Sequence, residues 1–140
     1  MATQTEERIV VLKEFQKSEG YQQINPGYSN KYISLPDDKL LCKVCVVTKD
    51  NPPTGHRHTT SDSIHVILEG EGEAITDSGR RPMKAGDLIY TKADELHGFR
   101  STTDKPLWFL SIEGPMPLDL LGPDRDLRGV LNAAGHRISD

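Results

Sequence analysis

Residues 55–72 constrain this chain more than any other stretch, because they combine a His-x-His pair with a β-branched run and a tight Gly-Glu-Gly turn. His56 and His58 stand two residues apart. Side chains at that spacing point to the same side of an extended chain. Two imidazoles on one face can bind one metal ion, and His97 is the candidate for a third ligand. The stretch therefore predicts a metal site on a framework of β-strands.

Short apolar runs separated by turn residues fill most of the remaining chain. The expected strands cover residues 31–35, 39–49, 64–69, 73–77, 81–84, 88–91, 96–101 and 107–113. A further strand is expected at residues 9–12, and a loop at residues 20–30. Strands at such close spacing are typical of a sandwich or barrel, so the chain is predicted to be all-β.

One short helix is expected near the C-terminus. Pro123 and Asp124 can begin it, and Gly135 can end it. We expect it to pack on the outside of the barrel through Leu127, Val130, Leu131 and Ala134. The predicted organisation is one domain, with a strand and loop arm at residues 1–38, a barrel at 39–114 and a helical tail at 115–140.

Composition limits the partners. The 140 residues suffice for one ordinary domain, and a net charge of −4 does not favour an electrostatic nucleic-acid binder. No apolar run approaches the ~20 residues of a membrane helix, and the N-terminus does not resemble a secretory signal. The expectation is a cytoplasmic protein with no membrane partner. An unpaired strand edge at residues 9–12, and the commonness of two-fold dimers, suggest a homodimer.

Cys42 and Cys45 match the pattern Cys-x-x-Cys, which can indicate a redox pair or half of a zinc site. Here they fall inside an expected strand, where a spacing of three places the two sulfurs on opposite faces. We therefore interpret them as inert, mostly buried thiols.

The two histidine-bearing stretches resemble the cupin superfamily. Its first motif corresponds to Gly55, His56 and His58 followed by the strand that ends at Gly70. Its second motif runs from Gly86 to Arg100 and contains His97. The resemblance covers residues 40–113 and implies a double-stranded β-helix, or jelly roll, with the metal inside. The Pro-x-Gly turn of the second motif is replaced by Lys-Ala-Asp at residues 92–94.

The resemblance also implies a glutamate ligand, and this chain lacks it. One count along the first motif places Ser63 at that position, and a second count places Asp62 there. Asp62 can act as a ligand only if a bulge turns it inward. The predicted ligands of a divalent Fe, Zn, Mn or Ni ion are His56, His58 and His97, with Asp62 or His65 as a possible fourth. The predicted pocket residues are Ser63, Tyr90, Phe99, Ser101 and Trp108, with Lys43 and Phe109 as weaker candidates.

His65 carries the functional prediction, since in some cupin lyases a general base stands two residues after the glutamate position. His65 can be that base, a fourth ligand or a core residue. The leading prediction is a metal-dependent lyase, isomerase or cyclase acting on a small oxygen-rich substrate. The alternatives are an iron dioxygenase of the three-histidine type and a non-catalytic cupin that binds or senses a small molecule. His136, the fifth histidine, is expected to be exposed.

Overall fold

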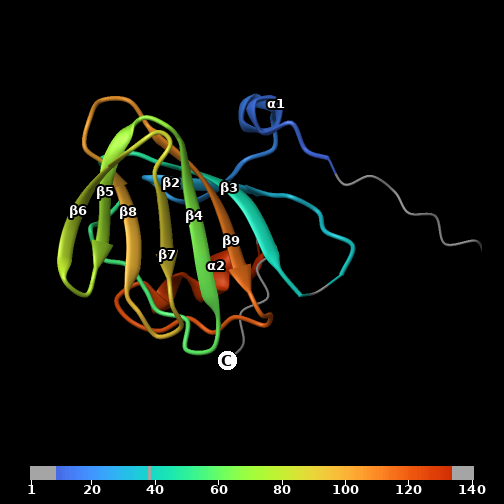
Figure 1. Ribbon diagram of the computed structural model, residues 1–140, viewed down its shortest axis with the longest axis vertical. Coiled ribbons are helices and arrows are strands. Elements are labelled where there is room, and N and C mark those ends of the chain that lie inside the picture. Colours follow the sequence, from blue (N-terminus) through green and yellow to red (C-terminus); the bar gives the residue numbers. More distant parts are fainter. Residues whose placement is uncertain (1–8, 38, 134–140) are drawn as a thin grey trace, which may run out of the picture.

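The protein, described by a computed structural model over residues 9–37 and 39–133, consists of two antiparallel β-sheets around one apolar interior (Figure 1). The larger sheet has the order β1-β2-β3-β9-β4-β7. Its strands are β1 (Gln22–Asn25), β2 (Tyr28–Tyr32), β3 (Leu41–Val47), β9 (Leu107–Gly114), β4 (Asp62–Glu69) and β7 (Leu88–Thr91). The smaller sheet consists of β6 (Gly79–Lys84), β5 (Glu71–Thr76) and β8 (His97–Ser101), in that order. The predicted all-β jelly roll is confirmed.

The interior is built from alternate residues of both sheets, and β9 shows this most clearly. Its inward residues are buried and its outward residues are partly exposed along the whole strand. Leu107 and Phe109 join the core cluster with Cys45, Val47, Ile67, Ala74, Met83 and Phe99. Ser111 and Glu113 continue the same buried face toward the other end of β9. The interior therefore changes from apolar to polar along this strand.

Both cysteines are free thiols of β3, with Cys45 fully buried and Cys42 partly exposed. Burial raises the pKa of Cys45 to about 11, so this thiol stays protonated and unreactive near neutral pH.

The prediction of a strand at residues 9–12 is wrong. Residues 9–11 lie in no strand, and α1 (Leu12–Lys17) begins at the last of the four. β-Branched residues form strands only where a sheet buries one of their faces. Ile9 is instead 74% exposed. The sheet edge invoked for dimerisation is therefore absent, and the homodimer stays a prediction.

The loop expected at residues 20–30 is also wrong, because this segment contains the hairpin of β1 and β2. Asn25-Pro26-Gly27 forms the turn, and the Asn25 side-chain oxygen accepts a hydrogen bond of 2.9 Å from the Gly27 amide. A Cβ on Gly27 would lie 2.2 Å from the Asn51 amide nitrogen. The turn signal was therefore present, but the polar strands beside it carry little of the alternation that marks a strand.

The C-terminal segment, residues 118–133, covers one end of the barrel. It contains the 3-10 helix η1 (Arg125–Leu127) and α2 (Arg128–Ala133), and α2 lies at the end away from α1 (Figure 1). Leu131 is 3% exposed, whereas Val130 is 38% exposed. The helix does not pack on the outside as expected, since Leu127 and Leu131 line the cavity that holds the histidines. Residues 134–136, including the expected end of the helix and His136, lie outside the described residues.

None of the helices within residues 9–37 and 39–133 is long and apolar enough to cross a membrane.

Candidate metal centre

Three imidazoles from two segments converge inside the barrel. His56 and His58 lie between Gly55 and β4, and His97 is the first residue of β8. The two segments are tied by paired backbone hydrogen bonds between His56 and His97, of 2.9 and 3.0 Å. Gly55 has φ +106°, and a Cβ there would lie 2.6 Å from the His97 carbonyl oxygen. Glycine at this position therefore permits the close approach that brings the histidines together.

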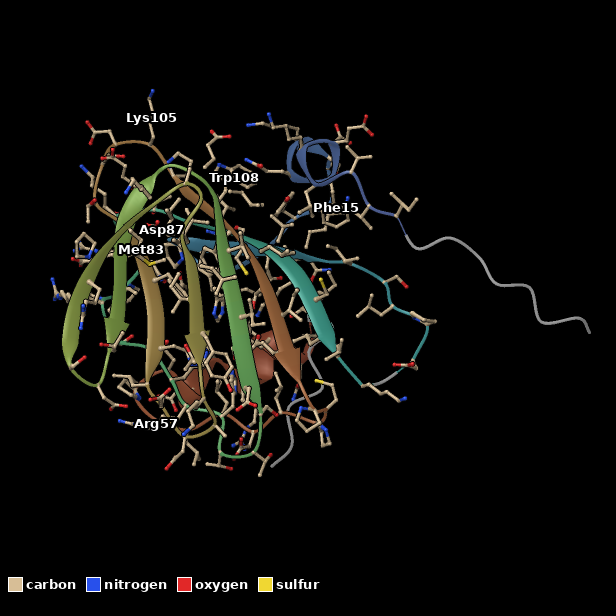
Figure 2. The ribbon with its side chains drawn as sticks, in the orientation of Figure 1. Phe15, Arg57, Met83, Asp87, Lys105 and Trp108 are labelled. Atoms are coloured by element: carbon tan, nitrogen blue, oxygen red, sulfur yellow. The ribbon has the colours of Figure 1, made fainter. Side chains whose placement is uncertain are left out.

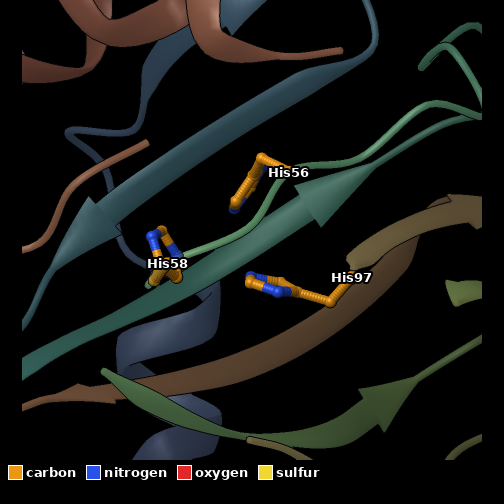
Figure 3. Close-up of side chains that lie close together, drawn as sticks. All are labelled: His56, His58 and His97. Carbon is orange, nitrogen blue, oxygen red and sulfur yellow. The ribbon is translucent and has the colours of Figure 1, made fainter. Parts of the chain in front are cut away.

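The three rings are close enough to share one ion. One ligand nitrogen from each ring can be chosen so that all three lie within 4.8 Å of one another. Ring centroids are 4.4 Å apart for His56 and His97, and 4.9 Å apart for each of the other two pairs. Figure 3 shows the three side chains turned toward a common space. Imidazole nitrogens bind zinc at about 2.0–2.1 Å, so two ligands of one ion lie within about 4.2 Å of each other, which is close to the spread of this set.

The C-terminal segment orients two of the rings. His58 Nδ1 lies 2.6 Å from the Asp119 carbonyl oxygen, and His56 Nδ1 lies 3.4 Å from Asp124 Oδ2. Asp119 is held in turn by the Thr59 amide, which donates to its carboxylate at 2.7 Å. An acceptor at Nδ1 places the ring proton there and leaves Nε2 as the metal-binding nitrogen. Both histidines therefore have the outer contacts of metal ligands.

Several buried ring nitrogens have no hydrogen-bond partner among the described residues. They are both nitrogens of His97 and Nδ1 of His65, whereas Nε2 of His58 lies 2.7 Å from the Glu113 carboxylate. Buried polar atoms without partners are costly and rare in folded proteins. A cation at the centre of the cluster would use these lone pairs, so the residues present fit a bound metal ion.

The cavity favours neutral imidazoles at three of the four histidines. Burial lowers the pKa of His56 and lowers that of His65 to about 3. Burial and the neighbouring imidazoles hold the pKa of His97 well below its ordinary value. At His58 burial also lowers the pKa, but the charge and contact of the Glu113 carboxylate outweigh it and raise the pKa. Neutral imidazole is the form that binds a metal.

Glu113 is the main residue that the sequence analysis missed. Its Oε2 atom lies 2.7 Å from His58 Nε2, and its Oε1 atom lies 3.6 Å from Lys43 Nζ. Burial alone would raise the pKa of Glu113, but His58 and Lys43 hold it well below its usual value. A carboxylate on the inward face of an apolar strand, in step with Leu107 and Phe109, was the available signal.

The structure brings some of the predicted pocket residues to the histidines. His65 and Phe99 line the cavity, their rings 4.5 Å apart. Ser63 does not line it, but its buried hydroxyl donates to the cavity residue Glu113 at 3.2 Å. The weaker candidates Lys43 and Phe109 line the cavity too. The cavity has a volume of about 50 Å³ and is bordered at its mouth by the C-terminal segment.

Four other predicted residues lie elsewhere. Asp62 faces outward because β4 has no bulge there, and its carboxylate accepts a hydrogen bond of 2.8 Å from the Ala93 amide. Tyr90 is 55% exposed on β7. Ser101 donates to the Lys105 carbonyl at 2.6 Å, and Trp108 stacks edge-on against Tyr21 at 5.6 Å.

Figure 2 shows that Trp108 lies far from the end of the barrel that holds the histidines. Lys105 and Trp108 lie at one end of the barrel, and Arg57, between the two motif histidines, lies at the other. Ser101 shares the inward face of His97 but is four residues farther along β8, so alternation alone could not place it in the pocket.

A family model described as the cupin domain matches residues 44–113, half of the 140-residue chain. This chain belongs to the cupin family. Among curated proteins the cupin resembles the pectin degradation protein KdgF of Dickeya dadantii, with 27% identity over 106 residues that cover 75% of this chain and 86% of that protein. It also resembles the oxalate-binding protein of Thermotoga maritima, with 38% identity over 58 residues. That match covers 41% of this cupin and only 47% of the relative.

Solved structures confirm the jelly-roll fold of the cupin. An uncharacterised protein with a double-stranded β-helix domain from Klebsiella pneumoniae superposes with a TM-score of 0.68 at 19% identity. The superposition covers 84% of this chain and 97% of that one.

Proposed function

We propose that this cupin is a metal-dependent enzyme that binds a small oxygen-rich substrate at His56, His58 and His97 and transfers a proton, as a lyase, isomerase or cyclase. The observation that carries the proposal is a fourth imidazole in the same cavity, since the ring of His65 lies 5.5 Å from that of His97. The names of two relatives, which refer to pectin degradation and to oxalate binding, support a substrate rich in oxygen.

The three imidazoles would hold a divalent Fe, Zn, Mn or Ni ion, which supplies Lewis acidity toward a carboxylate, carbonyl or hydroxyl oxygen when bound. His65 Nδ1 is the proposed proton acceptor. Its Nε2 atom lies 3.1 Å from the Ser111 hydroxyl, which can accept the ring proton and leave Nδ1 as a lone pair. An anionic substrate beside the ring raises its low pKa and makes it a stronger base.

Two aromatic rings narrow the rest of the cavity. Phe99 and Phe109 pack against His65 with ring centroids 4.5 and 5.7 Å away. The space of about 50 Å³ is enough for an ion and a few small ligand atoms. The C-terminal segment borders the mouth of this space through Leu120, Asp124, Leu127 and Leu131.

Proton exchange tests the proposal directly. The protein is purified without added metal, its metal content is measured, and it is incubated in D₂O with a panel of small hydroxy acids, keto acids and uronic acids. We expect deuterium to enter at a carbon next to a carbonyl or carboxylate of one class, as detected by proton NMR. His65→Ala should abolish the exchange and leave the metal content unchanged.

The alternatives give different results. Oxygen uptake with a diketone, without proton exchange, would favour the three-histidine dioxygenase. Saturable binding of an acid without exchange or oxygen uptake would favour the sensor. Loss of the metal in His65→Ala would make His65 a ligand rather than a base.

A further inference from the structure

The metal centre lacks the glutamate that the cupin pattern places on β4, where Ser63 stands instead. The register of the larger sheet pairs Ser63 directly with Glu113 of β9. Both side chains point inward and are buried, at 2% and 3% exposure. Side chains of directly opposed residues have Cβ atoms about 4.5–5.5 Å apart. Glu113 therefore delivers a carboxylate to the region that the missing side chain would occupy.

The Glu113 carboxylate lies as close to His58 as two ligands of one ion lie to each other. Oε2 lies 2.7 Å from Nε2, and both side chains are buried. Two atoms bound at right angles to one ion, each about 2.1 Å from it, lie about 3 Å apart and point at the ion.

Three neighbours hold the Glu113 carboxylate in place. The Ser63 hydroxyl donates to Oε2 at 3.2 Å, the Ser111 hydroxyl donates to Oε1 at 3.3 Å, and Lys43 Nζ lies 3.6 Å from Oε1. Lys43 is itself only 6% exposed, so its charge acts in a poorly solvated environment. These contacts keep the carboxylate ionised and aimed at His58, and the serine at position 63 becomes its hydrogen-bond donor.

We infer that Glu113 is the carboxylate ligand of the metal centre. It stands on β9, directly opposite the position on β4 where the cupin pattern has a glutamate and this chain has Ser63. The inference rests on the proposed metal centre and adds a fourth ligand to it. A carboxylate lowers the net charge of the bound site from +2 to +1. It also adds an oxygen donor, which suits Mn or Fe better than imidazoles alone.

The test is Co²⁺ binding to the metal-free protein, followed by visible absorption. Glu113→Gln should raise the Kd for Co²⁺ more than about 10-fold and change the position and intensity of the Co²⁺ bands. An outer contact also lowers affinity, by about 10–100-fold, but leaves the donor set intact. Asp62→Asn is the matched control, because it removes a carboxylate from the adjacent position of β4 that faces outward, and it should behave as wild type.

An exchange of the two paired residues provides a second test, useful if Glu113→Gln does not fold. The double variant Ser63→Glu/Glu113→Ser returns the carboxylate to β4, and we expect Co²⁺ affinity within about 10-fold of wild type. A folded double variant that does not bind Co²⁺, or a Glu113→Gln spectrum identical to wild type, would overturn the inference. If His97→Ala abolishes binding in either case, the three-histidine centre survives. If wild type binds no Co²⁺, the proposed function itself fails.

Discussion

The buried neutral His65 should make the metal-free protein sensitive to mild acid. In the unfolded chain a histidine has a pKa of about 6.5, whereas burial holds the folded pKa of His65 at about 3. Between these values the unfolded chain binds the proton and the folded chain does not. The free energy of unfolding therefore falls as the pH falls below about 6.5, and the loss continues to about pH 3.

The size of the effect follows from the two pKa values. At pH 7 the unfolded chain gains about 0.2 kcal/mol from protonating this histidine, and at pH 5 about 2 kcal/mol. Lowering the pH from 7 to 5 therefore reduces the free energy of unfolding by about 2 kcal/mol through His65 alone. A folded pKa of about 4 would give nearly the same value, because the folded protein is hardly protonated at pH 5 in either case.

His65→Phe isolates this contribution. The new ring should pack against Phe99 and Phe109, which already surround the imidazole. Urea unfolding of metal-free protein, followed by circular dichroism at pH 7 and pH 5, gives the acid-induced loss of stability for each protein. We expect the loss to be about 2 kcal/mol smaller in the variant than in wild type, even though His56 and His97 still contribute in both.

The control is Ile64→Phe, which adds the same ring at the neighbouring, partly exposed position of β4 and removes no titrating group. It should keep the acid sensitivity of wild type. Equal losses of stability in wild type and His65→Phe would refute the argument, because His65 would then not be neutral in the folded state.

Three further results are expected. Asp124→Asn removes the charged acceptor at His56 Nδ1 and should weaken Zn²⁺ binding about 10–100-fold in a chelator competition assay. Gly55→Ala should cost about 1–3 kcal/mol in urea unfolding and more than Gly79→Ala, since both glycines have positive φ but only Gly55 approaches the His97 backbone. Zn²⁺ at 100 times its Kd should add about 2.7 kcal/mol of stability, and a chelator should reverse this; an unchanged Tm would argue against the site.

The sequence predicted the structure correctly where the structure depends on a local pattern of residues. The strands after residue 40 could be predicted because alternation and turn residues are properties of neighbouring positions. Alternation also predicted that His56 and His58 point to the same side of the chain. The resemblance to cupins supported His97 as the third ligand. Propensity failed at residues 9–12, where no sheet buries the β-branched side chains. It failed at residues 20–30 because the polar strands of the hairpin carry little alternation.

What the sequence determined is the face on which each strand residue lies, and hence that His65 and Glu113 point inward. Only the tertiary structure decided which strand pairs with which, and so which residue lies opposite Ser63. Ser63 and Glu113 are 50 positions apart, and their pairing depends on the register of β4 against β9. The contacts of Asp119 and Asp124 with the histidines arise in the same way, from the packing of the C-terminal segment over the barrel. Alternation is a local property, whereas the identity of an opposing residue is fixed by the whole fold.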